Sequence, residues 1–252
     1  MKKVFIILLL VVFYITAGAK TYAIVTGVSN YDGEDHDLSQ STKDAKAIAK
    51  LYTDRGAAVT ILTSKYASHD NILAIVRKIA KVSTSNDDIV FFYSGHGAPN
   101  CIYTYDGNNI PPIMYSELFS ELNNCRCRNI TVFIDACFSG TAASSVKSKG
   151  FDSEDSNWKS LVKSSGKYIL MLSSRQDEAS GENGLVGAGF FTRALLKGLH
   201  GKCDENSDKK ITVMELFKYV YGDVVMHSSK KQHPQLVTSK SLYDHVVMDW
   251  SN

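Results

Sequence analysis

Short apolar runs alternate with amphipathic stretches along this chain. The runs have the length of buried strands, and the stretches repeat apolar side chains every three or four positions, as helices packed on a sheet do. The predicted strands are Thr21–Gly27, Ala57–Leu62, Ile89–Tyr93, Ile130–Ile134 and Lys167–Leu172. The predicted helices are Thr42–Arg55, His69–Ala80, Tyr115–Leu122, Phe190–Leu199 and Val213–Val225. This alternation predicts an α/β domain with a mostly parallel sheet and helices on both faces.

Two predicted strands end at a chemically reactive side chain. The strand ending at Tyr93 continues as Ser-Gly-His-Gly at 94–97, and the strand ending at Ile134 continues as Asp-Ala-Cys-Phe-Ser-Gly at 135–140. The carboxyl ends of parallel strands meet at one edge of the sheet, where open α/β folds place their sites. His96 and Cys137 are therefore candidates for a Cys/His nucleophilic dyad.

The chemistry of a thiol supports this pairing. An ordinary cysteine is mostly protonated at neutral pH, so a catalytic thiol needs a nearby base, which His96 can supply. The peptide N–H groups of Gly97 and Cys137 are candidate donors to a developing oxyanion. Taken singly, His96 is typical of a glycine-rich turn and Cys137 of a small buried side chain, but together at successive strand ends they favour catalysis.

These two motifs resemble the paired signatures of the caspase and metacaspase superfamily, especially its bacterial caspase-like members. Further segments that resemble the family are Tyr22–Tyr31, Lys43-Asp44-Ala45, Gly189–Leu196 and His233-Pro234-Gln235. The resemblance implies a caspase-like three-layer sandwich, with a mostly parallel six-stranded sheet and helices on both faces. It also implies a cysteine endopeptidase that uses no metal in the chemical step.

The resemblance to the metacaspase branch implies an acidic pocket for the side chain before the scissile bond. Its residues in this chain would be Asp44, Ser94 and Asp135. Two carboxylates in a water-poor pocket offset their desolvation only against a bound cation, which favours Arg or Lys over Asp. The expected partner is therefore a peptide or protein with Arg or Lys before the scissile bond. Phe138 stands where metacaspases usually carry His or Tyr, which bears on the subfamily more than on activity.

A long polar segment follows the candidate nucleophile. Residues 141–166 are rich in Ser, Lys, Gly and Asp, and a connection of this length is either functional or mobile. Many relatives cut themselves between these two strands, so the resemblance makes the lysines of this segment candidate self-cleavage sites. They are Lys147, Lys149, Lys159 and Lys163.

A second motif has the spacing of a calcium-binding EF-hand loop. The candidate ligands are Asp204, Asn206, Asp208, Thr212 and Glu215. Lys209 occupies the position where such loops carry glycine, and it tolerates the required positive φ poorly, so calcium would bind weakly or the loop is vestigial. The equal alternative is a polar loop in which Thr212 and Glu215 form a capping box. Bacterial relatives often have an Asp-rich loop here.

The amino-terminal segment has the pattern of a secretory signal peptide. Lys2 and Lys3 precede the apolar stretch Val4–Ile15, which is followed by small residues up to Ala19. The apolar stretch is too short to span a bilayer. We expect cleavage after Ala19, a peptidase domain over 20–252, secretion or periplasmic export, and no membrane association afterwards.

Composition and cysteine count narrow the picture further. The 252 residues are 44% hydrophobic and carry a formal net charge of +2, which suits one domain and gives no basic patch for nucleic acid. An odd number of cysteines in an exported chain leaves at least one thiol free. The five are Cys101, Cys125, Cys127, Cys137 and Cys203. A zinc site is not expected, and we consider either unpaired surface cysteines or a disulfide from Cys101 to Cys125 or Cys127.

Two alternatives to a metacaspase-like enzyme stay open. A catalytically silent member of the same fold would act as a binding or scaffold protein, although such a protein has no chemical need for a full dyad and pocket. A legumain- or gingipain-like peptidase shares the Gly-His-Gly and Cys pattern but prefers other side chains.

Overall fold

The structure is a computed structural model, and it describes residues 19–31, 37–107, 109–136, 162, 164–175 and 188–251. Cys137, the proposed signal peptide up to residue 18, and the four candidate self-cleavage lysines lie outside these residues. Within the described ranges, no helix combines the length and the apolar character needed to cross a membrane.

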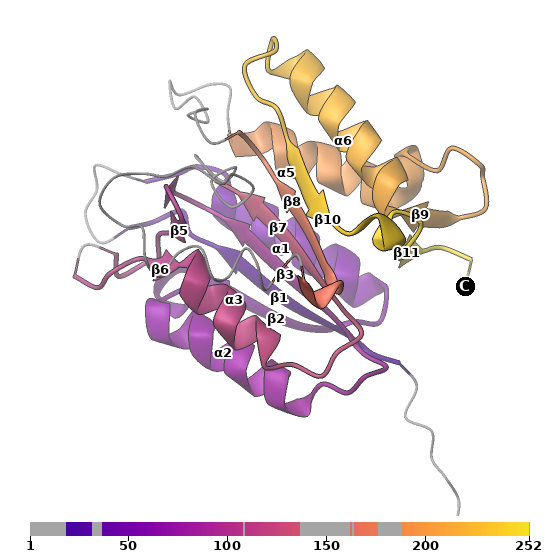
Figure 1. Ribbon diagram of the computed structural model, residues 1–252. Helices are drawn as coiled ribbons and strands as arrows, with labels where there is room; N and C mark the ends of the chain where they lie inside the picture. The colour runs from indigo at the N-terminus through magenta and orange to yellow at the C-terminus, as the bar shows by residue number, and fades with distance from the viewer. Residues whose placement is uncertain are drawn as a thin grey trace, which may run out of the picture.

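A six-stranded sheet forms the centre of the molecule (Figure 1), in the order β10-β8-β7-β3-β1-β2. Its strands are β1 (Thr21–Gly27), β2 (Ala58–Thr63), β3 (Asp88–Ser94), β7 (Asn129–Asp135), β8 (Tyr168–Leu172) and β10 (Gln235–Thr238). All neighbours are parallel except β10, which runs antiparallel to β8. The central strands are almost completely buried, because helices cover both faces.

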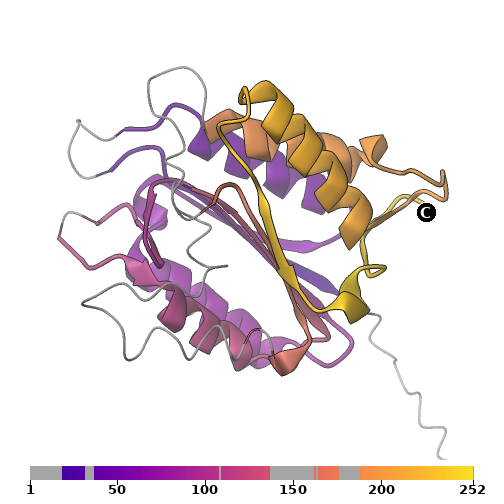
Figure 2. The same ribbon diagram turned by 45° about the horizontal axis from the view of Figure 1, so that its top comes forward.

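The helices form one layer on each side of the sheet (Figure 2). They are α1 (Ser41–Asp54), α2 (His69–Val82), α3 (Tyr115–Asn123), α5 (Ala188–Lys197) and α6 (Val213–His227). α1, α5 and α6 cover one face, and α2 and α3 cover the other. Each helix buries a stripe of apolar side chains against the sheet, such as Ile72, Val76 and Ile79 in α2. Each layer therefore completes a separate apolar core on its face of the sheet.

Short strands and turns complete the fold. β4 (Gly97–Ala98), β5 (Cys101–Ile102) and β6 (Ile113–Met114) form a small antiparallel sheet directly after His96. β9 (Lys210–Thr212) pairs with β11 (Val246–Asp249), and short helical turns occupy Ser64–Tyr66, Gly198–Lys202 and Lys240–Leu242. Strands of two to four residues show no alternation that sequence reading can detect.

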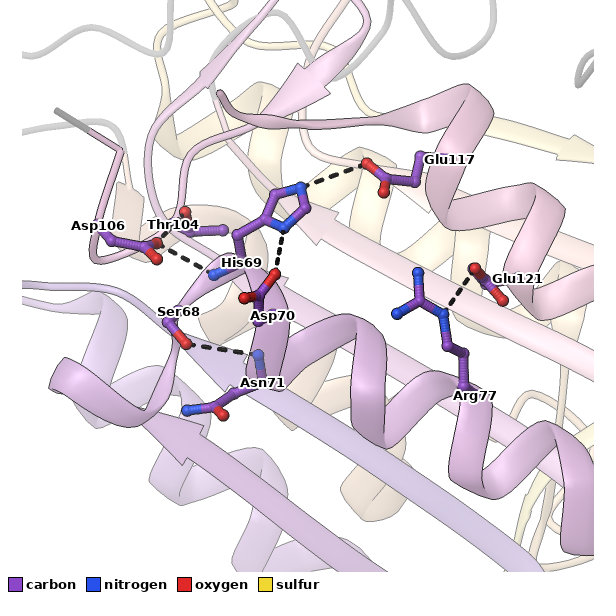
Figure 3. A network of polar contacts seen from close by, with 9 residues as sticks. All are labelled: Ser68, His69, Asp70, Asn71, Arg77, Thr104, Asp106, Glu117 and Glu121. Carbon is purple, nitrogen blue, oxygen red and sulfur yellow. Dashed lines mark hydrogen bonds and ion pairs between the residues drawn. The ribbon is translucent and has the colours of Figure 1, made fainter. Parts of the chain in front are cut away.

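The loop between β5 and β6 is tied to the start of α2, which in turn contacts α3 (Figure 3). Asp106 accepts hydrogen bonds from the backbone N–H of His69 and from the hydroxyl of Thr104, at 3.0 and 2.6 Å. The imidazole of His69 lies between Asp70 and Glu117, at 3.3 and 3.4 Å. These contacts attach the chain segment after His96 to the layer formed by α2 and α3.

The predicted α/β architecture and its mostly parallel six-stranded sheet are confirmed. The five predicted strands and five predicted helices all form, with their ends shifted by at most a few residues. The sixth strand, β10, was not located from the sequence, because its four residues are only half-buried and follow a proline turn.

The expected cysteine chemistry needs correction. Cys125 is disulfide-bonded to Cys127, so neither is available to Cys101. Cys101 and Cys203 carry reduced thiols, and all four of these cysteines are buried rather than on the surface. Cys125 and Cys127 pack in the core beneath α2 and α3, and Cys203 packs in the core beneath α1, α5 and α6, which the polar neighbours in the sequence did not indicate.

Candidate active site

Ser94 and Asp135 lie side by side at the carboxyl edge of the sheet, as the last register partners of β3 and β7. Two positions earlier, Phe92 and Phe133 are buried in the core beneath α1, α5 and α6. Because side chains alternate between the two faces of a strand, Ser94 and Asp135 point to this same face. They therefore meet the helices that cover it.

Helix α1 brings Asp44 to Ser94. The helix packs so closely on the end of β1 that a Cβ at Gly27 would lie 2.4 Å from the carbonyl oxygen of Ser41 and 2.6 Å from the Cβ of Ala45. Only glycine fits at this position, and the close approach places the first turn of α1 over the end of the sheet. The hydroxyl of Ser94 donates to the Asp44 carboxylate at 3.3 Å.

Helix α5 brings Thr192 to Asp135. The hydroxyl and the N–H of Thr192 both donate to Oδ2 of Asp135, at 2.6 and 3.2 Å. The side chain of Ser173, just past the end of β8, also favours the charged form and lowers the pKa of this carboxyl group. Asp135 is only 2% exposed, and a carboxylate buried to this degree requires such donors.

Burial makes both carboxyl groups hard to ionise. It raises the pKa of Asp135 to about 8, and the charge of Asp44 adds to this shift. The hydrogen bonds from Thr192 act in the opposite direction. Burial also raises the pKa of Asp44 to about 6, against the hydrogen bond from Ser94. Two acidic groups that share a water-poor site favour a cation between them, because it compensates both charges.

His96 lies two residues beyond Ser94 and is partly exposed. Its N–H donates to the hydroxyl of Tyr31 at 2.6 Å, and its carbonyl oxygen accepts from the hydroxyl of Tyr93 at 2.7 Å. Gly97 begins β4 and pairs with Ile102. The dyad of His96 and Cys137 stays a prediction, as does the oxyanion role of Gly97, because Cys137 lies outside the described residues.

A model of the caspase-domain family of peptidases matches residues 20–245. The chain belongs to the caspase-domain family. Two proteins named Metacaspase-1, from Debaryomyces hansenii and Scheffersomyces stipitis, are each 27% identical to this caspase domain over 157 residues. The matched region is 51% of this chain but only 35% and 38% of those two proteins, so the chain spans little more than a third of their length.

Solved structures support the architecture. The crystal structure of protein GSU0716 from Geobacter sulfurreducens matches this caspase domain with a TM-score of 0.63 at 19% sequence identity. The match covers 91% of this chain and 98% of that one. At this identity the likeness shows the fold alone, which is the three-layer α/β sandwich expected from the sequence.

In the candidate calcium loop of the caspase domain, candidate ligand side chains accept hydrogen bonds from the loop's own backbone N–H groups. Asp204 accepts from the N–H groups of Asp208 and Lys209, at 3.2 and 2.9 Å, and Lys209 adopts the positive φ of 64° that the loop requires. Glu215 accepts from the N–H and the hydroxyl of Thr212, at 2.9 and 2.7 Å, which completes the capping box of α6.

These hydrogen bonds already engage Asp204 and Glu215, two of the candidate calcium ligands. Among the described residues, no three His, Cys, Asp or Glu side chains converge closely enough to hold a metal. Both carboxylate oxygens of Glu215 already accept hydrogen bonds from backbone N–H groups, those of Glu205 and Thr212. Calcium binding therefore stays a prediction, and the capping box that was its alternative is present.

Three residues around the site were not assigned a role from the sequence: Tyr31, Tyr93 and Thr192. Tyr31 and Thr192 belong to segments that resemble the family, and Tyr93 directly precedes the Ser-Gly-His-Gly motif. Nothing in a tyrosine near a strand end or a threonine in a helix indicates what it contacts. Only the packing of α5 and of the loop after β1 brings the polar atoms of Thr192 to Asp135 and those of Tyr31 to His96.

Proposed function

We propose that this caspase domain is an endopeptidase that hydrolyses peptide bonds after Arg or Lys, with Cys137 as the nucleophile and His96 as its proton-transfer partner. The observation that supports the specificity is the group of Asp44, Ser94 and Asp135, in which Ser94 and Asp135 are buried and Asp44 is partly buried. Ser94 ends β3, two residues before His96. A cationic side chain bound there would place the following peptide bond next to His96.

The proposed reaction follows the chemistry of a cysteine nucleophile. The Cys137 thiolate attacks the carbonyl carbon, and the peptide C–N bond breaks as His96 delivers a proton to the leaving amine. Water then hydrolyses the acyl-enzyme, with His96 accepting a proton from the water. The N–H of Gly97 is the proposed donor to the oxyanion.

We also propose that the protein acts outside the cytosol. The pattern of residues 1–19 supports export, and the disulfide between Cys125 and Cys127 suits an oxidising compartment. Expression with and without residues 1–19, followed by fractionation, tests this. Retention of both forms in the cytosol would contradict it.

The first experiment measures hydrolysis of fluorogenic peptides that end in Arg, Lys, Asn or Asp before the reporter group. We expect turnover of the Arg and Lys peptides by the wild-type chain and none by Cys137→Ala or His96→Ala. Preferential Asn turnover would favour the legumain-like alternative.

A control separates catalysis from a scaffold role. Cys203→Ala removes a buried thiol that packs in the same core as α5 and α6 and is distant in sequence from His96 and Cys137. This variant should leave turnover intact. Absence of turnover in the wild-type chain, with all variants folded, would support the binding or scaffold alternative.

Self-processing in residues 141–166 is a separate proposal that follows from the specificity. Purified protein should be cut after Lys147, Lys149, Lys159 or Lys163, and mass spectrometry would locate the site. A single intact band in an active preparation would contradict this proposal without affecting the proposed peptidase activity.

A further inference from the structure

We propose that Tyr31 is a positioning residue for His96, holding both its peptide group and its imidazole ring. This inference rests on the proposed peptidase function. Tyr31 lies beyond the carboxyl end of β1, whereas His96 lies beyond that of β3, so one strand-end loop supports the catalytic group of another.

Two different parts of Tyr31 contact His96. The hydroxyl oxygen accepts a hydrogen bond from the backbone N–H of His96 at 2.6 Å. The aromatic ring lies against the imidazole, with centroids 4.7 Å apart and an interplanar angle of 40°. One side chain therefore restrains both the backbone position and the ring orientation of His96.

Tyr31 is itself held in place. It is only 8% exposed, and its backbone N–H donates to Oδ1 of Asp37 at 3.0 Å. Its hydroxyl also hydrogen-bonds with that of Tyr93. The loop after β1 is fastened to β3 by a hydrogen bond from the N–H of Val28 to the carbonyl oxygen of Ser94, at 2.9 Å. Because Tyr31 is itself held in place, its contacts restrict the movement of His96.

The carbonyl side of His96 has its own supports. Its oxygen accepts from the hydroxyl of Tyr93 and from the N–H of Tyr103, at 2.7 and 3.0 Å. The space is so tight that a Cβ at Gly95 would lie 2.4 Å from the Tyr93 hydroxyl and 2.8 Å from that of Tyr31. Removing the Tyr31 hydroxyl would therefore release the N–H of His96, while the N–H of Tyr103 still holds its carbonyl oxygen.

The position of His96 matters for proton transfer rather than for substrate binding. A general acid must lie within hydrogen-bond reach of the leaving amine, and small misplacements are costly. The proposed binding group of Asp44, Ser94 and Asp135 faces the layer of α1 and α5, while the Tyr93 ring packs in the core beneath α2 and α3. Loss of Tyr31 should therefore lower kcat and leave KM for an Arg peptide nearly unchanged.

The experiment compares Tyr31→Phe, which keeps the ring, with Tyr31→Leu, which loses ring and hydroxyl. The matched control is Tyr168→Phe, because Tyr168 is 1% exposed, its hydroxyl has no hydrogen-bond partner among the described residues, and it lies at the opposite end of the sheet. With an Arg peptide, we expect kcat to fall about 10-fold in Tyr31→Phe and about 100-fold in Tyr31→Leu, with KM changed less than about 2-fold. Tyr168→Phe should match the wild type.

A second readout does not depend on activity. In ¹⁵N-histidine NMR spectra, with the His96 signal assigned by its loss in His96→Gln, Tyr31→Leu should shift and broaden that signal. Tyr168→Phe should leave it unchanged.

The NMR result tests Tyr31 even if the wild-type chain proves inactive, in which case the proposed function alone fails. An unchanged His96 signal, or unchanged kcat in an active Tyr31→Phe variant, would overturn the positioning role. Should Tyr31→Leu not fold, Tyr31→Phe carries both measurements.

Discussion

Thr192 donates its hydroxyl and its N–H to a single oxygen of Asp135, at 2.6 and 3.2 Å. This contact joins α5 to the end of β7 and supplies hydrogen bonds to a carboxyl group that is otherwise cut off from water. The ability of Asp135 to carry a negative charge therefore depends on a residue that is distant in sequence.

Replacing Thr192 by valine removes the hydroxyl donor while keeping the shape of the side chain. Hydrogen bonds to charged groups contribute about 1.5–3 kcal/mol, so KM for an Arg peptide should rise about 10-fold or more. The control is Thr26→Val, because Thr26 is buried and its hydroxyl has no partner among the described residues. Equal KM values in the two variants would show that the Thr192 hydroxyl does not support the pocket.

Asp135→Asn should change specificity rather than abolish catalysis. The amide keeps the size of the side chain but loses the charge that a bound guanidinium needs. Truncation of a buried charge partner typically costs about 2–5 kcal/mol, so kcat/KM for an Arg peptide should fall at least about 30-fold. A citrulline peptide, which is neutral and similar in shape, should be affected far less. A parallel loss on both peptides would assign Asp135 a structural role.

The raised pKa of Asp135 also makes a prediction about stability. Its pKa is 3.8 in the unfolded reference and about 8 in the folded protein, so between these values the folded state holds a proton that the unfolded state has released. The contribution of Asp135 to stability therefore falls as pH rises from about 4 to about 8. Urea unfolding of the ligand-free wild type should show this decrease in the free energy of unfolding with rising pH. The Asp135→Asn variant should lack it. If the free energies of unfolding of the two proteins changed with pH in parallel, folding would not raise the pKa of Asp135.

The calcium loop can be tested through Lys209. This residue holds a positive φ of 64°, which glycine adopts without strain. If the loop binds calcium, isothermal titration should show weak binding by the wild type, with a Kd of about 10⁻³ M, and tighter binding by Lys209→Gly. Asp204→Asn in the Lys209→Gly background should remove the signal. Higher thermal stability of Lys209→Gly with no calcium heat would instead establish the loop as a capping element alone.

The sequence was sufficient to predict the strand–helix order and the edge where the site lies. Buried parallel strands such as Ile89–Tyr93 need continuous apolar runs, and amphipathic helices need a periodic apolar face, so both leave a local pattern. The reactive residues directly after two of these strands then point to one edge of the sheet. Short strands such as β10 and the pairing of Cys125 with Cys127 leave no such pattern, because their stability comes from neighbours.

What the sequence determined by itself is thus the architecture and the identity of Asp44, Ser94, His96 and Asp135 as candidates. Only the tertiary structure decided how these groups are supported: register puts Ser94 beside Asp135, close packing at Gly27 brings α1 to them, and Thr192 and Tyr31 arrive from other elements. The physical reason is that side-chain donors act over about 3 Å, and residues come within that distance through packing rather than through spacing along the chain.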